Sequence, residues 1–248
     1  MRVRDNSNKS WKKQMIDPFS SHLPIWHPKR LFFKLLTHIG ELYARLKFEQ
    51  SAIVYKELDF LPEIDCVSSK NSSVSGGVSD IQLKYLLKAV EETECFKDTV
   101  IVEIGAYRGG TTMCLAQKTS RKVIAVDMYH SGWKPAQSAL IKFNENTSNL
   151  DNVFLERTSS ISAAQNWKHG KASLVFIDGQ HNYINTRADI RGWFKHVIPG
   201  GLIALHDTDI KSAGTRLAAK EAEEFLTLYA HIKNLVIFLK PKTSTNSV

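Results

Sequence analysis

The sequence has few cysteines, no long apolar run and no excess of acidic residues over its 248 positions. Three cysteines without a Cys-x-x-Cys pair exclude a disulfide-rich scaffold and a cysteine zinc site, and favour a reducing, cytoplasmic compartment. No segment approaches the roughly 18–20 apolar residues of a membrane-spanning helix, and residues 1–13 are too polar for a secretory signal. Apolar residues still make up 43% of the chain, which excludes wholesale disorder.

The excess of basic residues is concentrated at the start of the chain. Residues 1–56 contain eleven Lys or Arg and four Asp or Glu, whereas residues 57–248 contain twenty-two and twenty-one. The net charge of +8 would favour nucleic acid or an anionic membrane as partner, but a nearly neutral body argues against nucleic acid. We therefore expect a basic amphipathic arm (1–65), a Ser/Gly-rich linker or lid loop (66–79) and a main domain (80–248).

The arm contains a predicted helix over Lys29–Gln50. Its apolar residues recur at helical spacing, which is typical of a face that seeks a partner. That partner could be the body, a second copy in a homodimer, or an anionic membrane surface, and Trp26 just upstream could pack on the helix or lie at a membrane interface. The apolar positions are Phe32, Leu35, Leu36, Ile39, Leu42, Tyr43 and Leu46.

The body alternates short apolar runs with helical segments, which predicts a doubly wound α/β fold with a mostly parallel sheet. The connection between the last two runs is too short for a parallel crossover, so one of them must pair antiparallel. The expected strands are Thr99–Ile104, Lys122–Val126, Asn152–Leu155, Ala172–Ile177, Gly201–Leu205, Phe225–Tyr229 and Leu235–Leu239, and the expected helices are Asp80–Thr93, Thr111–Lys118, Pro135–Asn146, Ser160–Trp167, Ile184–His196 and Gly214–Glu224.

Ionisable residues stand at the ends of four of the five expected parallel strands. Because ligands of open α/β sheets bind beyond the carboxyl ends of the strands, these residues predict a site there. They are Glu103, Asp127, Asp178 and the pair His206-Asp207.

The first strand-to-helix turn indicates what kind of ligand binds. Tyr107 stands where a dinucleotide fingerprint needs its second glycine, and no Walker lysine follows, so the turn suits a diphosphate poorly. Asp127 lies about 20 residues further on, where a carboxylate accepts ribose hydroxyls. A cofactor with a ribose but no diphosphate fits both observations.

The chain resembles a known family over about residues 77–239. VEIGAYRGGTT, VIAVD, FIDGQHNY and PGGLIALHD together are similar to class I S-adenosylmethionine-dependent methyltransferases, in the small-molecule and sugar O-methyltransferase-like group with an Asp-Gly-x-His motif. The resemblance implies a Rossmann-like sheet of seven strands and S-adenosylmethionine as cofactor.

The resemblance also implies roles for single residues. Glu103 and Gly105 would border the methionine part of the cofactor, and Asp127 would bind both ribose hydroxyls. Met128 would lie against the adenine and Ser159 at its edge, with Ser160 as the alternative. The cofactor site would extend to Tyr107, Gly109 and Asp178.

A hydroxyl acceptor must lose its proton during methyl transfer, either to a base or through a metal. The candidate catalytic residues are Asp178, His181 and His206. Related metal-dependent enzymes bind Mg²⁺ at these strand ends, so Asp178, His206 and Asp207 form the candidate metal site, although imidazole suits softer metals. Alternatively, His181 only pins its loop and His206 only bonds backbone.

Two further residues are not assigned to the chemistry. Asp189 lies at helical spacing after Tyr183 and is expected to brace its helix by pairing with Arg187 or Arg191. Cys114 is expected in the core.

The favoured function is S-adenosylmethionine-dependent O-methylation of a small hydroxylated acceptor, such as a sugar or natural product. The alternatives are a methyltransferase-fold binding or assembly module that acts through the arm, and an RNA methyltransferase. The acceptor pocket is expected from the arm, the linker and the loop His130–Pro135 with Trp133.

Overall fold

The computed structural model describes residues 27–47, 53, 58, 61–62, 77–130, 134–209 and 212–242. The predictions for Trp26, for Trp133 and for most of the linker lie outside these residues. Within them, no helix is both long and apolar enough to cross a membrane.

The body is one seven-stranded sheet in the order β3-β2-β1-β4-β5-β7-β6. The first five strands are parallel, and β7 runs antiparallel to both β5 and β6. The doubly wound sheet with an antiparallel end is therefore confirmed. The strands are β1 (Val100–Ile104), β2 (Val123–Val126), β3 (Val153–Glu156), β4 (Ala172–Ile177), β5 (Val197–Leu205), β6 (Thr227–Ile232) and β7 (Leu235–Leu239).

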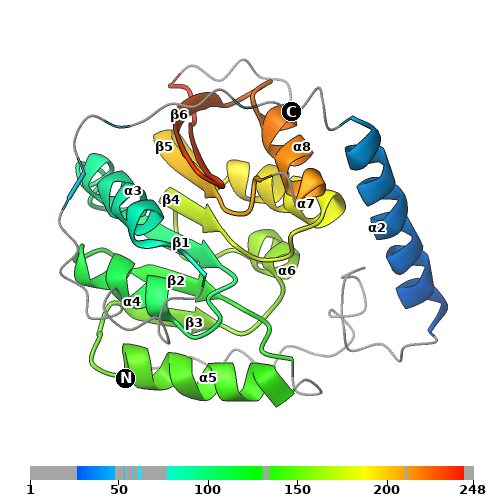
Figure 1. Ribbon diagram of the computed structural model, residues 1–248. Coiled ribbons are helices and arrows are strands. Elements are labelled where there is room, and N and C mark those ends of the chain that lie inside the picture. Colours follow the sequence, from blue (N-terminus) through cyan, green and yellow to red (C-terminus); the bar gives the residue numbers. More distant parts are fainter. Residues whose placement is uncertain are drawn as a thin grey trace.

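Helices cover both faces of this sheet (Figure 1). On one face the core joins β-strand residues to α3, α4 and α5, and on the other it joins them to α6, α7 and α8. The helix of the arm, α2, lies outside α7 and α8. The helices are α2 (Pro28–Leu46), α3 (Asp80–Glu92), α4 (Gly110–Gln117), α5 (Lys134–Thr147), α6 (Ser160–Gln165), α7 (Tyr183–Phe194) and α8 (Ala213–Ala222).

The central strands form the core because their sequences are apolar on both faces. Every residue of β1, β2 and β4 is buried, as expected of parallel strands that lie between two helical layers. Phe176 and Leu174 point to the α3 and α4 side, while Val175 and Ile177 belong to the opposite core. This burial fixes the level at which the strands end, and with it the position of the residues that follow them.

Two strands, β5 and β6, differ from their predicted bounds by more than one residue. β6 begins at Thr227, because the amide groups of Phe225 and Leu226 still bond the carbonyl of Ala222 and continue the last turn of α8. β5 already begins at Val197, which pairs with Ala172 before the register shifts. An irregular pairing at this point tolerates Pro199, which has no amide hydrogen to donate.

The helix α2 packs on the body through its small residues. Gly40 and Ala44 are buried, and a Cβ at Gly40 would lie 2.7 Å from Ile184 of α7. Glu41 accepts a hydrogen bond of 2.5 Å from the backbone amide of Tyr183, the first residue of α7. Docking on the body is thus observed, but through a face that the apolar pattern did not indicate, and Glu41 lies on that face.

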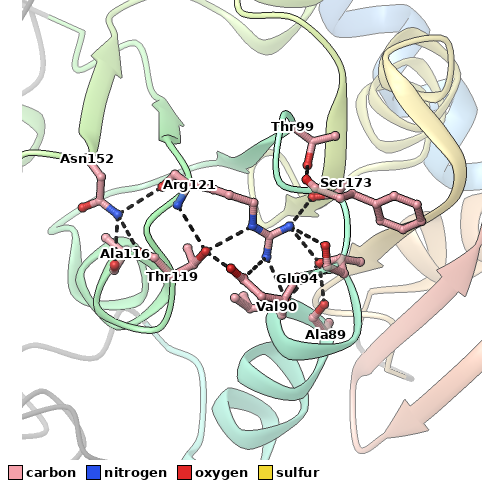
Figure 2. Close-up of polar contacts among 11 residues, drawn as sticks. Ala89, Val90, Glu94, Thr99, Ala116, Thr119, Arg121, Asn152 and Ser173 are labelled. Atoms are coloured by element: carbon pink, nitrogen blue, oxygen red, sulfur yellow. Dashed lines mark hydrogen bonds and ion pairs between the residues drawn. The ribbon is translucent and has the colours of Figure 1, made fainter.

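A buried arginine joins the C-terminal end of α3 to the starts of β2 and β4, at the end of the sheet opposite the cavity. Arg121 donates to the carbonyls of Val90 and Thr93 at 2.8 Å and to the hydroxyl of Ser173 at 2.6 Å (Figure 2). It also pairs with Glu94 at 3.0 Å. Burial lowers the pKa of Arg121, and Glu94 opposes this effect. The guanidinium thereby caps α3 and ties it to β2 and β4.

We expect Arg121→Met to lower the free energy of unfolding by about 2 kcal/mol, because the buried carbonyls and hydroxyl would lose their donor. Urea denaturation measures this change. The matched control is Arg187→Met, which removes the more exposed pair between Arg187 and Glu221 and should cost less than about 1 kcal/mol. Equal losses in the two variants would contradict the role of Arg121.

Candidate active site

A cavity of about 920 Å³ opens at the carboxyl ends of β1, β2, β4 and β5. Its wall is built from the residues that directly follow these strands, with further residues from α2, α6 and α7. Predicted site residues in its lining are Gly105, Tyr107, Asp127, Met128, Ser159, Ser160, Asp178, His181, His206 and Asp207.

Asp127 holds together the turns that follow β1 and β2. Its two carboxylate oxygens accept hydrogen bonds of 3.0 Å from the amides of Tyr107 and Tyr129. Both tyrosines have positive φ values, 46° and 41°, which L-residues adopt only at a cost in energy. Burial raises the pKa of the Asp127 carboxyl, while the bonds from Tyr129 and Tyr107 lower it.

The first turn approaches the end of β4 so closely that only glycine fits. Gly105 has a φ of 86°, and a Cβ there would lie 2.2 Å from the carbonyl oxygen of Asp178. Gly105 therefore brings the loops after β1 and β4 into contact beside the cavity. Tyr107, two residues on, lines the cavity and is partly exposed.

Met128, Ser159 and Ser160 also line the cavity. The Ser159 hydroxyl caps α6 by accepting the amide of Ser162 at 3.1 Å. The Ser160 hydroxyl accepts the indole N–H of Trp193 at 2.8 Å. Both hydroxyls thus already have a protein partner, and the choice between them stays a prediction.

Glu103 and Gly109 lie outside the lining of the cavity. Gly109 precedes α4 with a φ of 75°, and a Cβ there would lie 2.7 Å from Phe143 of α5. Glu103 is buried within β1 and accepts a hydrogen bond from Thr112. Burial raises the pKa of Glu103 to about 8, so this carboxyl is protonated at neutral pH.

The raised pKa of Glu103 makes stability depend on pH. The folded state keeps the proton up to about pH 8, whereas the unfolded chain loses it near 4.5, so stability falls as the pH rises between these values. We expect Glu103→Gln, which mimics the neutral acid, to match wild type at pH 4 and to exceed it in free energy of unfolding by about 5 kcal/mol at pH 9. Denaturation at both pH values tests this. Exposed Glu224→Gln is the control, and an equal gain at pH 4 would contradict the titration.

Two histidines and two aspartates meet where β4 and β5 end side by side. His206 Nδ1 lies 3.0 Å from Asp178 Oδ1 and 3.6 Å from Asp207 Oδ1. His181 Nδ1 lies 3.0 Å from Asp207 Oδ2. His206 is buried, whereas the His181 side chain is 46% exposed, so His181 is the histidine that a ligand in the cavity can reach more easily.

The surroundings of His206 favour its charged form. Burial lowers the pKa of His206, but hydrogen bonds to Asp178 and Asp207 raise it by more, to about 10. The bond to His206 lowers the pKa of Asp207. His206 is therefore a cation at neutral pH. Its Nδ1 already carries a proton and cannot accept one from the hydroxyl of an acceptor.

The set of residues that could bind a metal differs from the predicted one. Ligand atoms of Asp178, His181 and Asp207 all lie within 4.8 Å of one another, with His181 in place of His206. One imidazole and two carboxylates fit a transition metal better than Mg²⁺, which prefers oxygen ligands. His206 points its Nδ1 at Asp178 instead.

A chain of polar side chains supports Asp207 from behind. Asn234, in the turn between β6 and β7, donates to Asp207 Oδ1 at 2.8 Å and accepts from Gln82 of α3. Gln82 in turn accepts hydrogen bonds from the amide and hydroxyl of Ser79. Asp207 has a φ of 54°, so this chain holds its carboxylate on an otherwise unfavourable backbone.

Several lining residues were missed by the sequence reasoning. Tyr129 follows Asp127 by two positions, and this short spacing was the available signal. Asn185 and Asp189 are buried residues of α7 that face the cavity, and Arg30 reaches it from α2. Nothing in the local sequence around Arg30 links it to the strand ends, because the contact depends on how α2 packs.

Asp189 was expected to pair with Arg187 or Arg191 of its own helix, but these two arginines contact other residues. Arg187 pairs with Glu221 at 2.9 Å, and Arg191 lies over the ring of Phe225. Cys114 is buried in α4, as expected, and Cys95 is a free, exposed thiol.

The order of the strands and the position of the cavity define the class I methyltransferase fold. An O-methyltransferase from Bacillus cereus, solved with S-adenosylhomocysteine, superposes with a TM-score of 0.52 at 16% identity and covers 82% of this chain and all of its own. TomG from Streptomyces achromogenes, an O-methyltransferase of tomaymycin synthesis solved with S-adenosylmethionine, has a TM-score of 0.51 at 13% identity and covers 82% and 98%.

Sequence comparison points the same way. Residues 102–208 match a family model described as a methyltransferase domain. An uncharacterized protein of Sinorhizobium fredii, y4gI, is 22% identical over 123 residues. The match covers 46% of this chain but only 14% of that relative.

Proposed function

We propose that the protein is an S-adenosylmethionine-dependent methyltransferase that methylates a hydroxyl group of a small acceptor, such as a sugar or natural product. One observation carries this proposal: the Asp127 carboxylate and the group of Asp178, His181 and Asp207 line one cavity. This supports the proposal, because a carboxylate that would bind the ribose and a group that would take up the proton lie on the wall of the same cavity.

The residues after β1 and β2 would bind the cofactor, which supplies an electrophilic methyl group when bound. Each Asp127 oxygen already accepts one amide and has a second lone pair for a ribose hydroxyl. The side chain of Met128 supplies an apolar contact for the adenine. Gly105 lets the first turn pack directly against the backbone of Asp178, which would keep the two loops that flank the cofactor together.

On the acceptor side, we assign the general base to His181. Asp207 accepts a hydrogen bond from Nδ1 of His181, which leaves Nε2 as the atom that takes the hydroxyl proton. The negative charge of Asp207 stabilises the imidazolium that results. The His206 cation neutralises Asp178 and keeps that carboxylate in one orientation at the cavity wall.

A metal-dependent mechanism would use the same place. Asp178, His181 and Asp207 would hold the ion, which would lower the pKa of the acceptor hydroxyl when bound. We favour the general base, because imidazole groups already satisfy both carboxylates. The two mechanisms differ in their response to a chelator.

The test begins with thermal unfolding in the presence of S-adenosylmethionine or NAD, each with and without Mg²⁺ or Mn²⁺. We expect S-adenosylmethionine to raise the midpoint and NAD to leave it unchanged, since a ligand stabilises the state that binds it. Formation of S-adenosylhomocysteine is then followed with a panel of sugars and phenols. Stabilisation by NAD would refute the cofactor assignment, and methylation of RNA with no turnover of small hydroxyl compounds would refute the acceptor class.

A further inference from the structure

The helix α2 turns its most apolar face away from the protein. Seven large apolar side chains of this helix are between 45% and 78% exposed. They recur at intervals of three and four residues and form one stripe along the helix. The stripe consists of Leu31, Phe32, Leu35, Ile39, Leu42, Tyr43 and Leu46.

The contacts with the body fix this orientation. A Cβ at Gly214, near the start of α8, would lie 2.0 Å from Glu41 Oε1, so α2 and α8 are in close contact. The Glu41 bond to Tyr183 and the burial of Gly40 and Ala44 hold the opposite face of α2 against α7 and α8. Turning the stripe inward would break these contacts and would require space for leucine side chains where glycine and alanine now pack.

Basic residues flank the stripe on both sides. Lys34, His38 and Arg45 lie three positions after Leu31, Leu35 and Leu42, which places them along one border, and all three are exposed. Lys29 is exposed on the other border, three positions before Phe32. Glu41 is the one acidic residue of Pro28–Leu46, and it bonds the body. The exposed surface of the helix is thus apolar with a basic rim.

We propose that this face of α2 docks in the plane of an anionic lipid bilayer. An apolar stripe bordered by lysine and arginine is the arrangement of helices that lie in the membrane interface, with apolar side chains below the headgroups and cations among them. A second copy of the chain fits less well, because either border would then face another basic border. Anionic headgroups have the complementary charge.

The dimensions of the stripe agree with surface docking. From Leu31 to Leu46 it is roughly 23 Å long at 1.5 Å per residue, shorter than the ~30 Å hydrocarbon core that a spanning helix crosses. The opposite face is held by the body, so the helix can insert only along its side. Arg30 of the same helix lines the cavity, so docking would bring the cavity to within about one helix diameter, ~10 Å, of the bilayer surface.

The experiment measures binding of the full chain to phosphatidylcholine vesicles with and without phosphatidylglycerol by flotation, in the absence of S-adenosylmethionine. We expect binding to the anionic vesicles, and weaker binding as the salt concentration rises. Leu35→Glu/Leu42→Glu should abolish it. Lys34→Ala/Arg45→Ala should weaken it about 30-fold, at about fivefold for each cation removed.

The control is Ile141→Glu, which adds the same acidic group in place of a large apolar residue that is 61% exposed on α5. It should bind vesicles like wild type. All variants replace exposed side chains, so their unfolding midpoints should stay near that of wild type. Because the charge-removal variant leaves the apolar stripe intact, it tests the proposal even if the double glutamate variant unfolds.

Absence of wild-type binding, or full binding by Leu35→Glu/Leu42→Glu, would overturn the proposal. Analytical sedimentation tests whether a second copy of the chain covers the stripe instead. A wild-type dimer that the same double variant converts to monomers, without binding to vesicles, would assign the stripe to a second copy and would also overturn the proposal. Equal binding to neutral and anionic vesicles would overturn the requirement for anionic lipid.

Discussion

Asp127→Ala should raise the dissociation constant for S-adenosylmethionine by about 100-fold, because two charge-assisted hydrogen bonds to the ribose would be lost. The same change removes the acceptor for the amides of Tyr107 and Tyr129. Since both residues have a positive φ, their turns would relax. The part of the cavity wall that these turns form would then lose its shape. Titration calorimetry measures the affinity.

A matched pair of variants separates binding from folding. Asp127→Asn keeps one oxygen acceptor and nearly the same volume, and should weaken binding less than alanine while keeping the unfolding midpoint closer to wild type. Asp151→Ala, at an exposed position before β3, should bind like wild type. Unchanged affinity in Asp127→Ala would contradict the cofactor site, whatever its effect on stability.

His181→Ala should lower kcat by about 100- to 10,000-fold, the range for loss of a general base. The affinity for S-adenosylmethionine should change less than threefold (about 0.6 kcal/mol), because Asp127 and Met128 are unaffected. The assay uses the best acceptor from the panel and measures S-adenosylhomocysteine formation. His38→Ala, an exposed histidine on α2, is the control in vesicle-free buffer and should turn over like wild type.

A chelator distinguishes the two roles that His181 could have. A general base acts without a metal, so we expect wild-type activity to persist after metal removal. Loss of activity that Mn²⁺ restores and Mg²⁺ does not would instead assign Asp178, His181 and Asp207 to a metal centre, in keeping with the imidazole among its ligands. Full activity of His181→Ala would rule out both roles.

Local patterning was sufficient to predict the sheet. VIAV is apolar at every position and ASLVFI at every position except Ser173, as strands buried on both faces require. The acids that follow these runs mark the edge where parallel strands end. The short connection before Leu235 required an antiparallel pair, and β7 supplies it. These features depend on residues close together in the chain, so a single sequence contains them.

The roles of the two histidines depended on contacts between distant residues. His181 lies four residues after the end of β4 and pairs with Asp207 after β5. This contact is set by the side-by-side order of the two strands and by the left-handed backbone of Asp207. The charge of His206 follows from its contacts with Asp178 and Asp207, which outweigh the opposing effect of burial. The spacing of residues along the sequence does not indicate which histidine nitrogen lies against which carboxylate.

The arm shows the same division between local and distant information. Its amino acids specify an amphipathic helix and a basic rim, because propensity and 3.6-residue spacing are local properties. Which face meets the body was settled by Gly40 and Ala44, whose small side chains allow α7 and α8 to approach closely. Because the backbones pack closely there, the less apolar face of α2 contacts the body and the more apolar face is exposed. Predicting this orientation requires knowledge of both surfaces.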